Sequence, residues 1–368
     1  MATSHSPWRV PGAMLFSVGE CSYEVDLTYP MVEELLYSQY GARTLLAWER
    51  KDGQLHRQVL VRSVPPLTPD DPKELVRMRA RLMEEARLAT YLRHPGIARI
   101  HGCHEVRGTL YVVSEHVRGT SLNELINTSL ERQVRLSPAF CMYVGAQAAS
   151  ALHAAHTCTD ERGAPLGIVH RDVNPARLYL GTGGEVVLTD FASARSLLPG
   201  RVATTLPRPH GDVFYCAPEA LLMEQTEPRS DLFALGLVLL ELATGRHLYS
   251  TARARPEELA GALTPAVKDQ VLGAVTATGA YPDLPDHVQD CILRAATFGT
   301  PDLEELTHPL TPPLRSILRG LLQPRPRERP ASAAQARAEL QAGLASLEAP
   351  YDASQALSEV RRVLSGVH

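Results

Sequence analysis

The chain has 368 residues, of which 44% are hydrophobic, and a formal net charge of −4. A chain of this composition can bury a sizeable core, which excludes disorder throughout. The small net charge, without long blocks of one sign, excludes the electrostatic footprint of a nucleic-acid or anionic-membrane binder, so a near-neutral protein partner fits better.

The first part of the chain is predicted to add little to the core. Its opening residues, MATSHSPWRVPGAMLF, lack a basic stretch followed by a long apolar run, so they do not resemble a signal peptide. Residues 1–36 show weak periodicity, with YEVDLTY as a candidate edge strand. We interpret them as an N-terminal extension.

A small sheet with one helix is predicted next. The apolar runs TLLAW and QVLVRSV are separated by the turn-prone KDGQ, which is typical of a β-hairpin. Asp71 as a cap and Pro72 at the first helical position indicate a helix start. TLYVVSEHV predicts another strand. The helix face should be lined by Leu75, Met78, Leu82, Ala86 and Ala89.

Helices dominate the rest of the sequence. Ser137 and Pro138 are expected to begin a helix that runs to about His156, and the strands LYL and EVVLTD follow, joined by the turn GTGG. Ser230 is predicted to cap the most apolar helix, which Gly245 ends. Strands first and helices second indicate an α+β fold with two segregated lobes, and a ligand is expected in the crevice between them.

Neither a membrane span nor a metal site is expected. The longest apolar segment, residues 232–243, is shorter than the roughly 20 residues that cross a bilayer, and it contains Glu241. The six cysteines lack zinc or disulfide-scaffold spacing, so we expect reduced thiols. The HGCHE segment, with His101, Cys103 and His104, is expected at a turn between strands without a second pair nearby. We therefore expect a cytoplasmic protein that does not bind membranes.

Several motifs then occur in a fixed order. Glu85 on the predicted helix is followed by HRD at 170–172, DFA at 190–192 and APE at 217–219, and then by Asp231 and Arg329. In this order the chain resembles the protein kinase family, most nearly bacterial serine/threonine kinases, over roughly residues 37–345.

The resemblance implies a two-lobed protein-kinase-like fold. A small antiparallel-sheet N-lobe is expected at residues 37–118 and a large helical C-lobe at 119–345. The C-lobe is enlarged at 251–310, and a helical tail follows at 346–368. The tail could pack on the body or on another chain, and the sequence leaves both alternatives open.

Some of the motif residues have structural roles in the family. The resemblance implies that Glu219 pairs with Arg329 and that Asp231 accepts hydrogen bonds from the backbone around His170. His170 and Phe191 are expected to pack in the core between the lobes. The residues assigned to this structural group are His170, Arg171, Phe191, Glu219, Asp231 and Arg329.

The phosphate-transfer positions depart from the family pattern. The family uses a glycine-rich cover, a third-strand lysine, metal ligands and a base. By resemblance, Asp172 occupies the base position, and Arg62 stands where the lysine would pair with Glu85. Arginine and lysine are not interchangeable at a shaped site. The glycine positions hold Tyr37, Gln39 and Ala42, and none of Lys51, Lys73 and Lys268 is placed to replace the missing lysine.

The metal site is altered as well. Arg177 stands at the metal-binding asparagine position, beside the expected magnesium ligand Asp190. We hypothesise that its guanidinium bridges Asp190 and Asp172 in place of the metal. Asp212 replaces a threonine near Asp172, where like charges raise one pKa or require a cation, which Arg177 or Arg171 could supply.

The nucleotide pocket is expected to be vestigial. Leu60 lies on the same strand face as Arg62, where the family has alanine, and Tyr179 would form the floor of the pocket. Ser114 completes the predicted lining. Two bulky side chains in this space should weaken or abolish adenine binding, so no cofactor is expected.

Two functions remain in consideration. The first is a pseudokinase that acts as a protein-binding scaffold or regulator, with an active kinase or signalling protein as partner. Residues 251–310 are the predicted partner site, and the alternative for this segment is an ordinary elaboration of the lobe. The alternative is a divergent active serine/threonine kinase with ATP and magnesium, in which Asp172 is the base, Asp190 the metal ligand and Arg62 the phosphate contact. Five independent substitutions favour the first function. They are the loss of the glycine-rich cover, the arginine at the third-strand lysine position, the bulky residues in the nucleotide pocket, the arginine at the metal-binding asparagine position, and the aspartate that replaces a threonine near Asp172.

Overall fold

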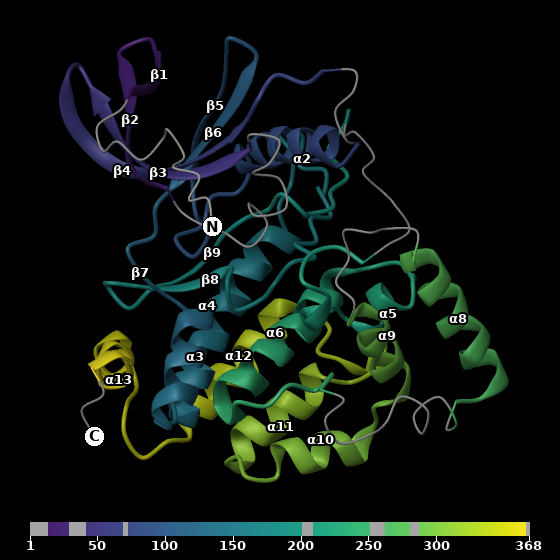
Figure 1. Cartoon of the computed structure of the whole chain (residues 1–368). Coiled ribbons are helices and arrows are strands. Elements are labelled where there is room, and N and C mark those ends of the chain that lie inside the picture. The colour runs from purple at the N-terminus through teal and green to yellow at the C-terminus, as the bar shows by residue number, and fades with distance from the viewer. Residues whose placement is uncertain are drawn as a thin grey trace, which may run out of the picture. The chain divides into compact units, whose positions relative to one another are not determined.

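The computed structural model describes residues 14–28, 42–68, 73–200, 209–250, 261, 263–279 and 287–365. The chain forms two compact units. The sheet unit comprises Met1–Arg93 and Ala98–Val117, and the helical unit comprises His94–Ile97 and Arg118–His368. Figure 1 shows an antiparallel sheet in the first and mostly helices in the second, which confirms the predicted α+β class.

The sheet unit contains a six-stranded antiparallel sheet in the order β1-β2-β3-β4-β6-β5. The predicted hairpin is formed by β3 and β4, and its turn residues Asp52 and Gly53 have positive φ. The strands are β1 (Met14–Val18), β2 (Cys21–Thr28), β3 (Arg43–Lys51), β4 (Gln54–Val64), β5 (Ile100–Val106) and β6 (Thr109–Glu115).

Part of the segment interpreted as an extension belongs to this sheet. YEVDLTY lies largely in β2, which is not an edge strand because β1 pairs on its outer side. Phe16 on β1 is buried and stacks on Tyr23 and Tyr111, with ring centroids 4.5 and 4.1 Å away. Aromatic pairs stabilise a fold by more than the burial of their surface. These contacts therefore explain why the short strand β1 stays paired with the sheet.

The single described helix of the sheet unit is α2 (Lys73–Ala89). Leu75, Leu82 and Leu88 are buried along one face, with Glu85 among them. The predicted cap and proline at 71 and 72 lie outside the described residues. The HGCHE segment lies on β5 and not at a turn: Gly102 to Glu105 pair with β6, and the register shifts at His101.

The helical unit begins with a three-stranded sheet in the order β7-β8-β9. The two strands predicted around GTGG are β8 and β9, and Ser137 caps α4 as expected. The elements are β7 (Gly119–Ser121), α3 (Leu122–Arg132), α4 (Pro138–His156), β8 (Leu178–Gly181), β9 (Val186–Leu188), η2 (Val213–Tyr215), α5 (Pro218–Leu221), α6 (Pro228–Thr244), α8 (Pro265–Gly279), α9 (Val288–Thr297), α10 (Thr300–Thr307), α11 (Pro312–Leu321), η3 (Pro326–Glu328), α12 (Ala333–Ala345) and α13 (Ala353–Ser365).

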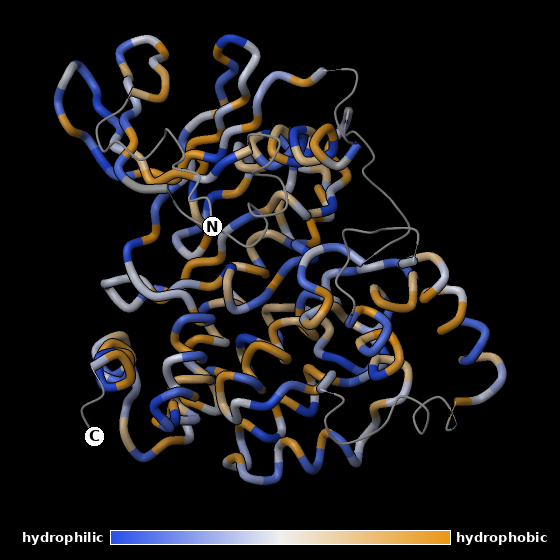
Figure 2. Tube along the Cα trace, in the orientation of Figure 1, coloured by the Kyte–Doolittle hydropathy of each residue, from blue (hydrophilic) through white to orange (hydrophobic). Residues whose placement is uncertain are grey.

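The apolar helix α6 is the centre of this unit, packed against α4, α11 and α12. Figure 2 shows the hydrophobic residues that gather along these helices. Gly245 ends α6 in a left-handed conformation, as predicted. Ser230, however, is not the cap: Pro228 starts the helix earlier, so Glu227 is the N-cap and Ser230 completes a capping box from the third position.

The described part of the enlarged segment contains the helices α8 and α9. The tail forms α13, which packs on α3 and α4 of its own chain. Among the described helices, none combines the length and the apolar character that crossing a membrane would require.

Candidate active site

The loop that carries the HRD motif is fixed by a buried carboxylate from α6. Asp231 accepts hydrogen bonds from the amides of His170 and Arg171, at 2.8 and 2.9 Å, and contacts His156 Nε2 at 2.8 Å. Burial raises the pKa of Asp231, but His156 and the neighbouring charges outweigh it and lower the pKa overall. The predicted role of Asp231 is thus visible in its contacts, and His156 is a structural partner.

His170 and Phe191 pack edge to face, with ring centroids 4.5 Å apart. His170 Nε2 also lies 3.1 Å from the carbonyl oxygen of Thr189, the residue before Asp190. Burial lowers the pKa of His170, which favours the neutral ring. This packing joins the HRD loop to the DFA segment within the helical unit.

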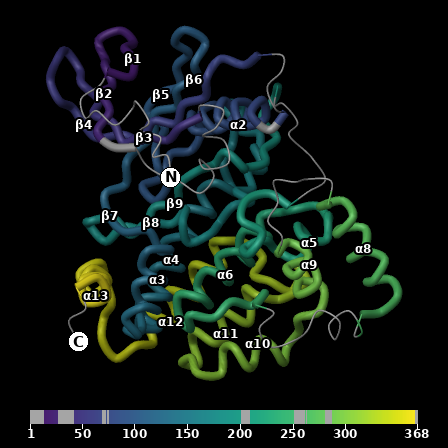
Figure 3. The backbone as a smooth tube through the Cα atoms, in the orientation of Figure 1, coloured from purple at the N-terminus to yellow at the C-terminus, as the bar shows by residue number. Residues whose placement is uncertain are grey.

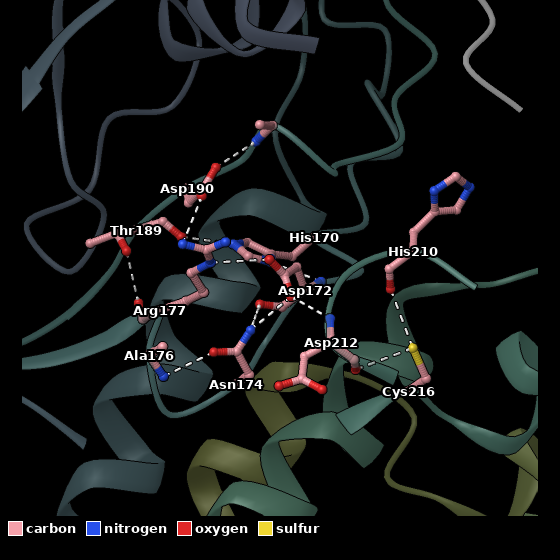
Figure 4. Close-up of polar contacts among 11 residues, drawn as sticks. His170, Asp172, Asn174, Ala176, Arg177, Thr189, Asp190, His210, Asp212 and Cys216 are labelled. Atoms are coloured by element: carbon pink, nitrogen blue, oxygen red, sulfur yellow. Dashed lines mark hydrogen bonds and ion pairs between the residues drawn. The ribbon is translucent and has the colours of Figure 1, made fainter. Parts of the chain in front are cut away.

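Asp172 is buried, and the chain itself supplies its hydrogen-bond donors (Figure 4). One carboxylate oxygen accepts from Asn174 Nδ2 at 2.7 Å and from the amide of Asp212 at 3.0 Å. The other lies 3.1 Å from Arg177 Nε. Because a carboxylate offers about four lone-pair sites, three of them are already taken.

Arg177 connects the two aspartates, as Figure 4 shows. Its Nη1 lies 3.0 Å from Asp190 Oδ2, while its Nε contacts Asp172. The other oxygen of Asp190 accepts a hydrogen bond from the amide of Ala192 at 3.2 Å. The Arg177 side chain is only 7% exposed, so this charge-assisted bridge is shielded from water. Its geometry is that of the bridge hypothesised from the sequence.

The donor set does not fit magnesium. Mg²⁺ requires an octahedron of oxygen ligands and keeps several waters, whereas here a guanidinium lies between the two carboxylates. Across the described residues, no group of three or more His, Cys, Asp and Glu side chains is arranged to hold a metal ion. The arginine supplies the positive charge that the carboxylates need.

Asp212 lies beside Asp172, as the sequence predicted, but the direct contact is made by its backbone. It reaches Asp172 through its backbone amide, while its carboxylate caps η2 by accepting from the amide of Phe214 at 3.0 Å. Burial raises the pKa of Asp212, and the charge of Asp172 adds to this effect. Arg171 directs its Nε to the carbonyl oxygen of Ser193 at 2.8 Å.

Sequence reasoning missed two contributors to this arrangement. Gly211 has a φ of +74°, and a Cβ there would collide with the Asp172 carboxylate and the Arg171 carbonyl. A glycine is thus required where the segment crosses Asp172. The second contributor is Asn174, whose side-chain amide donates to Asp172. The glycine of GDVFYCAPE was the available signal for the first.

In the sheet unit, Arg62 on β4 pairs with Glu85 on α2, with Nη2 and Oε2 2.5 Å apart. Leu60 and Arg62 share one half-buried strand face, while Val59 and Val61 are fully buried on the other. Leu60 pairs with Ser114, whose hydroxyl lies 3.4 Å from the Leu60 carbonyl oxygen. The strand alternation used in the prediction therefore holds.

Other predicted nucleotide-site residues are only partly placed. Tyr37 and Gln39 lie outside the described residues, and Ala42 is fully buried. Tyr179 is half-buried on β8, paired with Ser121. Leu60 and Tyr179 belong to different units, so a pocket that they line together stays a prediction.

Glu219 and Arg329 form the predicted pair. The contact is bidentate, at 2.7 and 2.8 Å, and the Arg329 side chain is completely buried. Ser230 donates a further hydrogen bond to Glu219 at 2.6 Å. The Arg329 guanidinium also lies over the Phe233 ring, 4.7 Å from its centroid. This cluster ties α5 to α6 and to the segment after η3.

Near η2, His247 predicts a pH dependence of stability. Burial lowers its pKa to about 4, against about 6.5 in an unfolded chain. Between these values the unfolded state binds a proton that the folded state does not, so the free energy of unfolding falls as the pH drops, by about 3 kcal/mol in all.

His247→Asn should flatten this slope, since its side-chain oxygen can still accept from the Tyr249 amide, which lies 3.1 Å from the His247 ring. Urea unfolding between pH 4 and pH 7 measures the slope. Equal slopes in the two proteins would contradict the assignment.

Comparison with known proteins identifies the family of this chain. The family model of the protein kinase domain matches residues 68–340. Over 275 residues the chain is 33% identical to serine/threonine-protein kinase PknA of Mycobacterium tuberculosis, covering 72% of this chain and 57% of the relative. Over 260 residues it is 32% identical to tyrosine-protein kinase MasK of Myxococcus xanthus, covering 68% and 37%.

Over 200 residues it is 32% identical to serine/threonine-protein kinase PknB of Mycolicibacterium smegmatis, covering 53% and 29%. The matched region thus spans less than two thirds of each of these relatives. The chain belongs to the protein kinase domain family and is related to bacterial serine/threonine kinases.

Proposed function

We propose that this chain is a cytoplasmic pseudokinase, a kinase-like domain that binds a protein partner as a scaffold or regulator and has lost, or nearly lost, ATP binding. The observation that carries the proposal is the position of Arg177 between Asp172 and Asp190. Phosphoryl transfer depends on metal ions that neutralise the developing charge of the phosphates. A guanidinium already paired with both aspartates leaves no acidic pair for the ion.

The environment of Asp172 supports the same conclusion. A base at this position must accept the proton of a substrate hydroxyl within hydrogen-bond reach. Asn174, Arg177 and the Asp212 amide already donate to its carboxylate. Arg62, paired with Glu85, replaces a compact ammonium with a larger planar fork, and the two groups are not interchangeable at a shaped site.

The alternative is a divergent active serine/threonine kinase. Asp172 and Asp190 are both present, and the similar proteins are named as kinases. That similarity supports the alternative more directly than it supports a pseudokinase. In this case ATP and magnesium would have to displace Arg177 from its bridge.

Thermal melting in four conditions distinguishes the two functions: no ligand, ATP, magnesium, and both. A ligand at 100 times its dissociation constant stabilises the folded state by about 2.7 kcal/mol. We expect no shift of the melting temperature in any condition. A magnesium-dependent shift, with phosphate incorporation that Asp172→Asn abolishes, would establish the alternative.

The partner is proposed to be a protein, such as an active kinase, bound through the enlarged segment at 251–310. The described part of this segment includes α8, where Leu272 is 65% exposed. A pull-down of the partner by the full chain and by a chain without this segment tests the location. Equal recovery of the partner would place its site elsewhere.

A further inference from the structure

The tail helix α13 contacts the body at three separate points. It buries Ala356, Val360 and Val363, and Figure 2 shows hydrophobic and hydrophilic residues alternating along it. Figure 3 shows it beside α3, although Arg132 and Val363 are 231 residues apart in the chain.

The last turn of α13 is capped from α3. Arg132 donates to the carbonyl oxygens of Val363 and Leu364, at 3.0 and 2.5 Å. These carbonyls have no partner within the helix, and a cation at this end also suits the helix dipole. The end of the tail is thus fixed by a side chain that precedes the loop to α4.

The middle of α13 completes the start of α4. Glu359 accepts from the amide of Ser137 at 2.9 Å and from its hydroxyl at 2.5 Å. In a capping box the third helical residue supplies this acceptor, but here that residue is Phe140. Glu359 therefore supplies from the tail what the local sequence of α4 lacks, and Tyr351 donates to the same carboxylate at 2.7 Å.

The beginning of the tail contacts the turn between β8 and β9. A Cβ on Gly184 would lie only 2.6 Å from the Cβ of Ala353, so the two backbones are close. Tyr143 on α4 donates to the Gly184 carbonyl oxygen at 2.8 Å, and its ring meets that of Tyr351 edge to face, 5.7 Å between centroids.

The other end of the β8–β9 hairpin carries the candidate active site. Arg177 directly precedes β8, and Asp190 follows β9 by two residues. The amide and the hydroxyl of Thr189 both donate to the Arg177 carbonyl oxygen, at 2.9 and 3.2 Å. The hairpin is therefore held at its tip by the tail and at its base by the residues that form the Arg177 bridge.

We propose that α13 is a releasable latch that couples the C-terminal tail to the active-site bridge through α4 and the β8–β9 hairpin. Docked, it caps α4 and fixes the hairpin tip. Released, it removes the acceptor from Ser137, uncovers the apolar surface of α3 and α4, and loosens the hairpin that positions Arg177 and Asp190. The proposal does not depend on whether the chain transfers phosphate.

Cys141 on α4 reports release. Its side chain is fully buried, and burial raises the pKa of its thiol, with the nearby Glu359 carboxylate adding to the effect. In the full-length chain under native conditions, maleimide labelling would be followed by mass spectrometry for each cysteine. Cys103 is exposed and serves as the positive control, and buried Cys291 on α9 reports global unfolding.

In the native chain Cys141 should label faster than Cys291, because release is a local opening that costs less than global unfolding. Glu359→Ala should accelerate Cys141 labelling by at least about ten-fold, since hydrogen bonds to a charged acceptor are lost. Tyr351→Phe removes only the hydrogen bond from Tyr351 to Glu359 and should accelerate Cys141 labelling less. Because this change is milder, it still tests the latch if Glu359→Ala fails to fold. Exposed Glu348→Ala is the matched control and should change nothing.

Amide hydrogen exchange tests the coupling. In Glu359→Ala, residues 178–189 should exchange more than about two-fold faster, while α6 keeps its native rate. Two results would overturn the proposal. One is equal labelling rates of Cys141 and Cys291 in the native chain. The other is faster Cys141 labelling with unchanged exchange in the hairpin.

Discussion

Replacement of Arg177 by asparagine is expected to lower the free energy of unfolding by about 3–5 kcal/mol in the absence of divalent cations. The change removes a buried cation that contacts both Asp172 and Asp190.

The same variant should gain a response to magnesium. Asparagine offers an oxygen ligand beside two carboxylates, the donor type that Mg²⁺ prefers. Chemical denaturation with and without Mg²⁺ measures this, and titration with Mn²⁺ followed by electron paramagnetic resonance counts the bound ions. Most of the lost stability should return with the metal.

Arg177→Met is the matched control, because it removes the charge without adding an oxygen. It should lose similar stability, and magnesium should not restore it. The free energy of unfolding of the native protein should not change when magnesium is added. Stabilisation of the native protein by Mg²⁺ would show that the bridge opens readily, and the argument for a pseudokinase would then fail.

The second large effect is expected at the pair of Glu219 and Arg329. Glu219→Ala leaves a fully buried guanidinium without its carboxylate, which should lower the free energy of unfolding by about 3–5 kcal/mol. Arg329 keeps hydrogen bonds to the carbonyl oxygens of Gln323 and Pro324, so its orientation is retained while its charge is uncompensated.

A nearby surface pair provides the control for this prediction. Arg325 and Glu328 are 3.3 Å apart, but the Arg325 side chain is 82% exposed. Arg325→Ala should cost less than about 1 kcal/mol. Urea denaturation of both variants, with the double variant of Glu219 and Arg329, gives the coupling energy. A loss at Glu219 no larger than at Arg325 would refute the structural role.

Local sequence signals predicted local structure well. Ser137 and Pro138 start α4 and Gly245 ends α6, because a cap or a left-handed residue acts within one helical turn. The hairpin of β3 and β4 followed from alternation and a turn. The resemblance to protein kinases implied the contacts of Asp231 and the pair of Glu219 and Arg329, which the structure shows.

The sequence-based predictions were incomplete where contacts with another segment of the chain determine the structure. Whether β1 belongs to the sheet depends on the contacts of Phe16 with Tyr23 and Tyr111, and Tyr111 lies far along the chain from β1. The sequence placed Asp212 near Asp172, but it did not predict that the Asp212 amide donates to Asp172 while its carboxylate accepts from the Phe214 amide. Residue types alone do not fix which way a side chain turns when two polar partners compete for it.

By itself, the sequence determined the α+β class and the order of the motifs, and the resemblance that these motifs carry drew attention to Arg177. Only the tertiary structure decided that Glu359 in the tail caps α4 and that Gly211 brings a backbone amide onto Asp172. The physical reason is range: caps, turns and alternation act over a few residues, whereas these contacts depend on how separate elements pack, which no local pattern encodes.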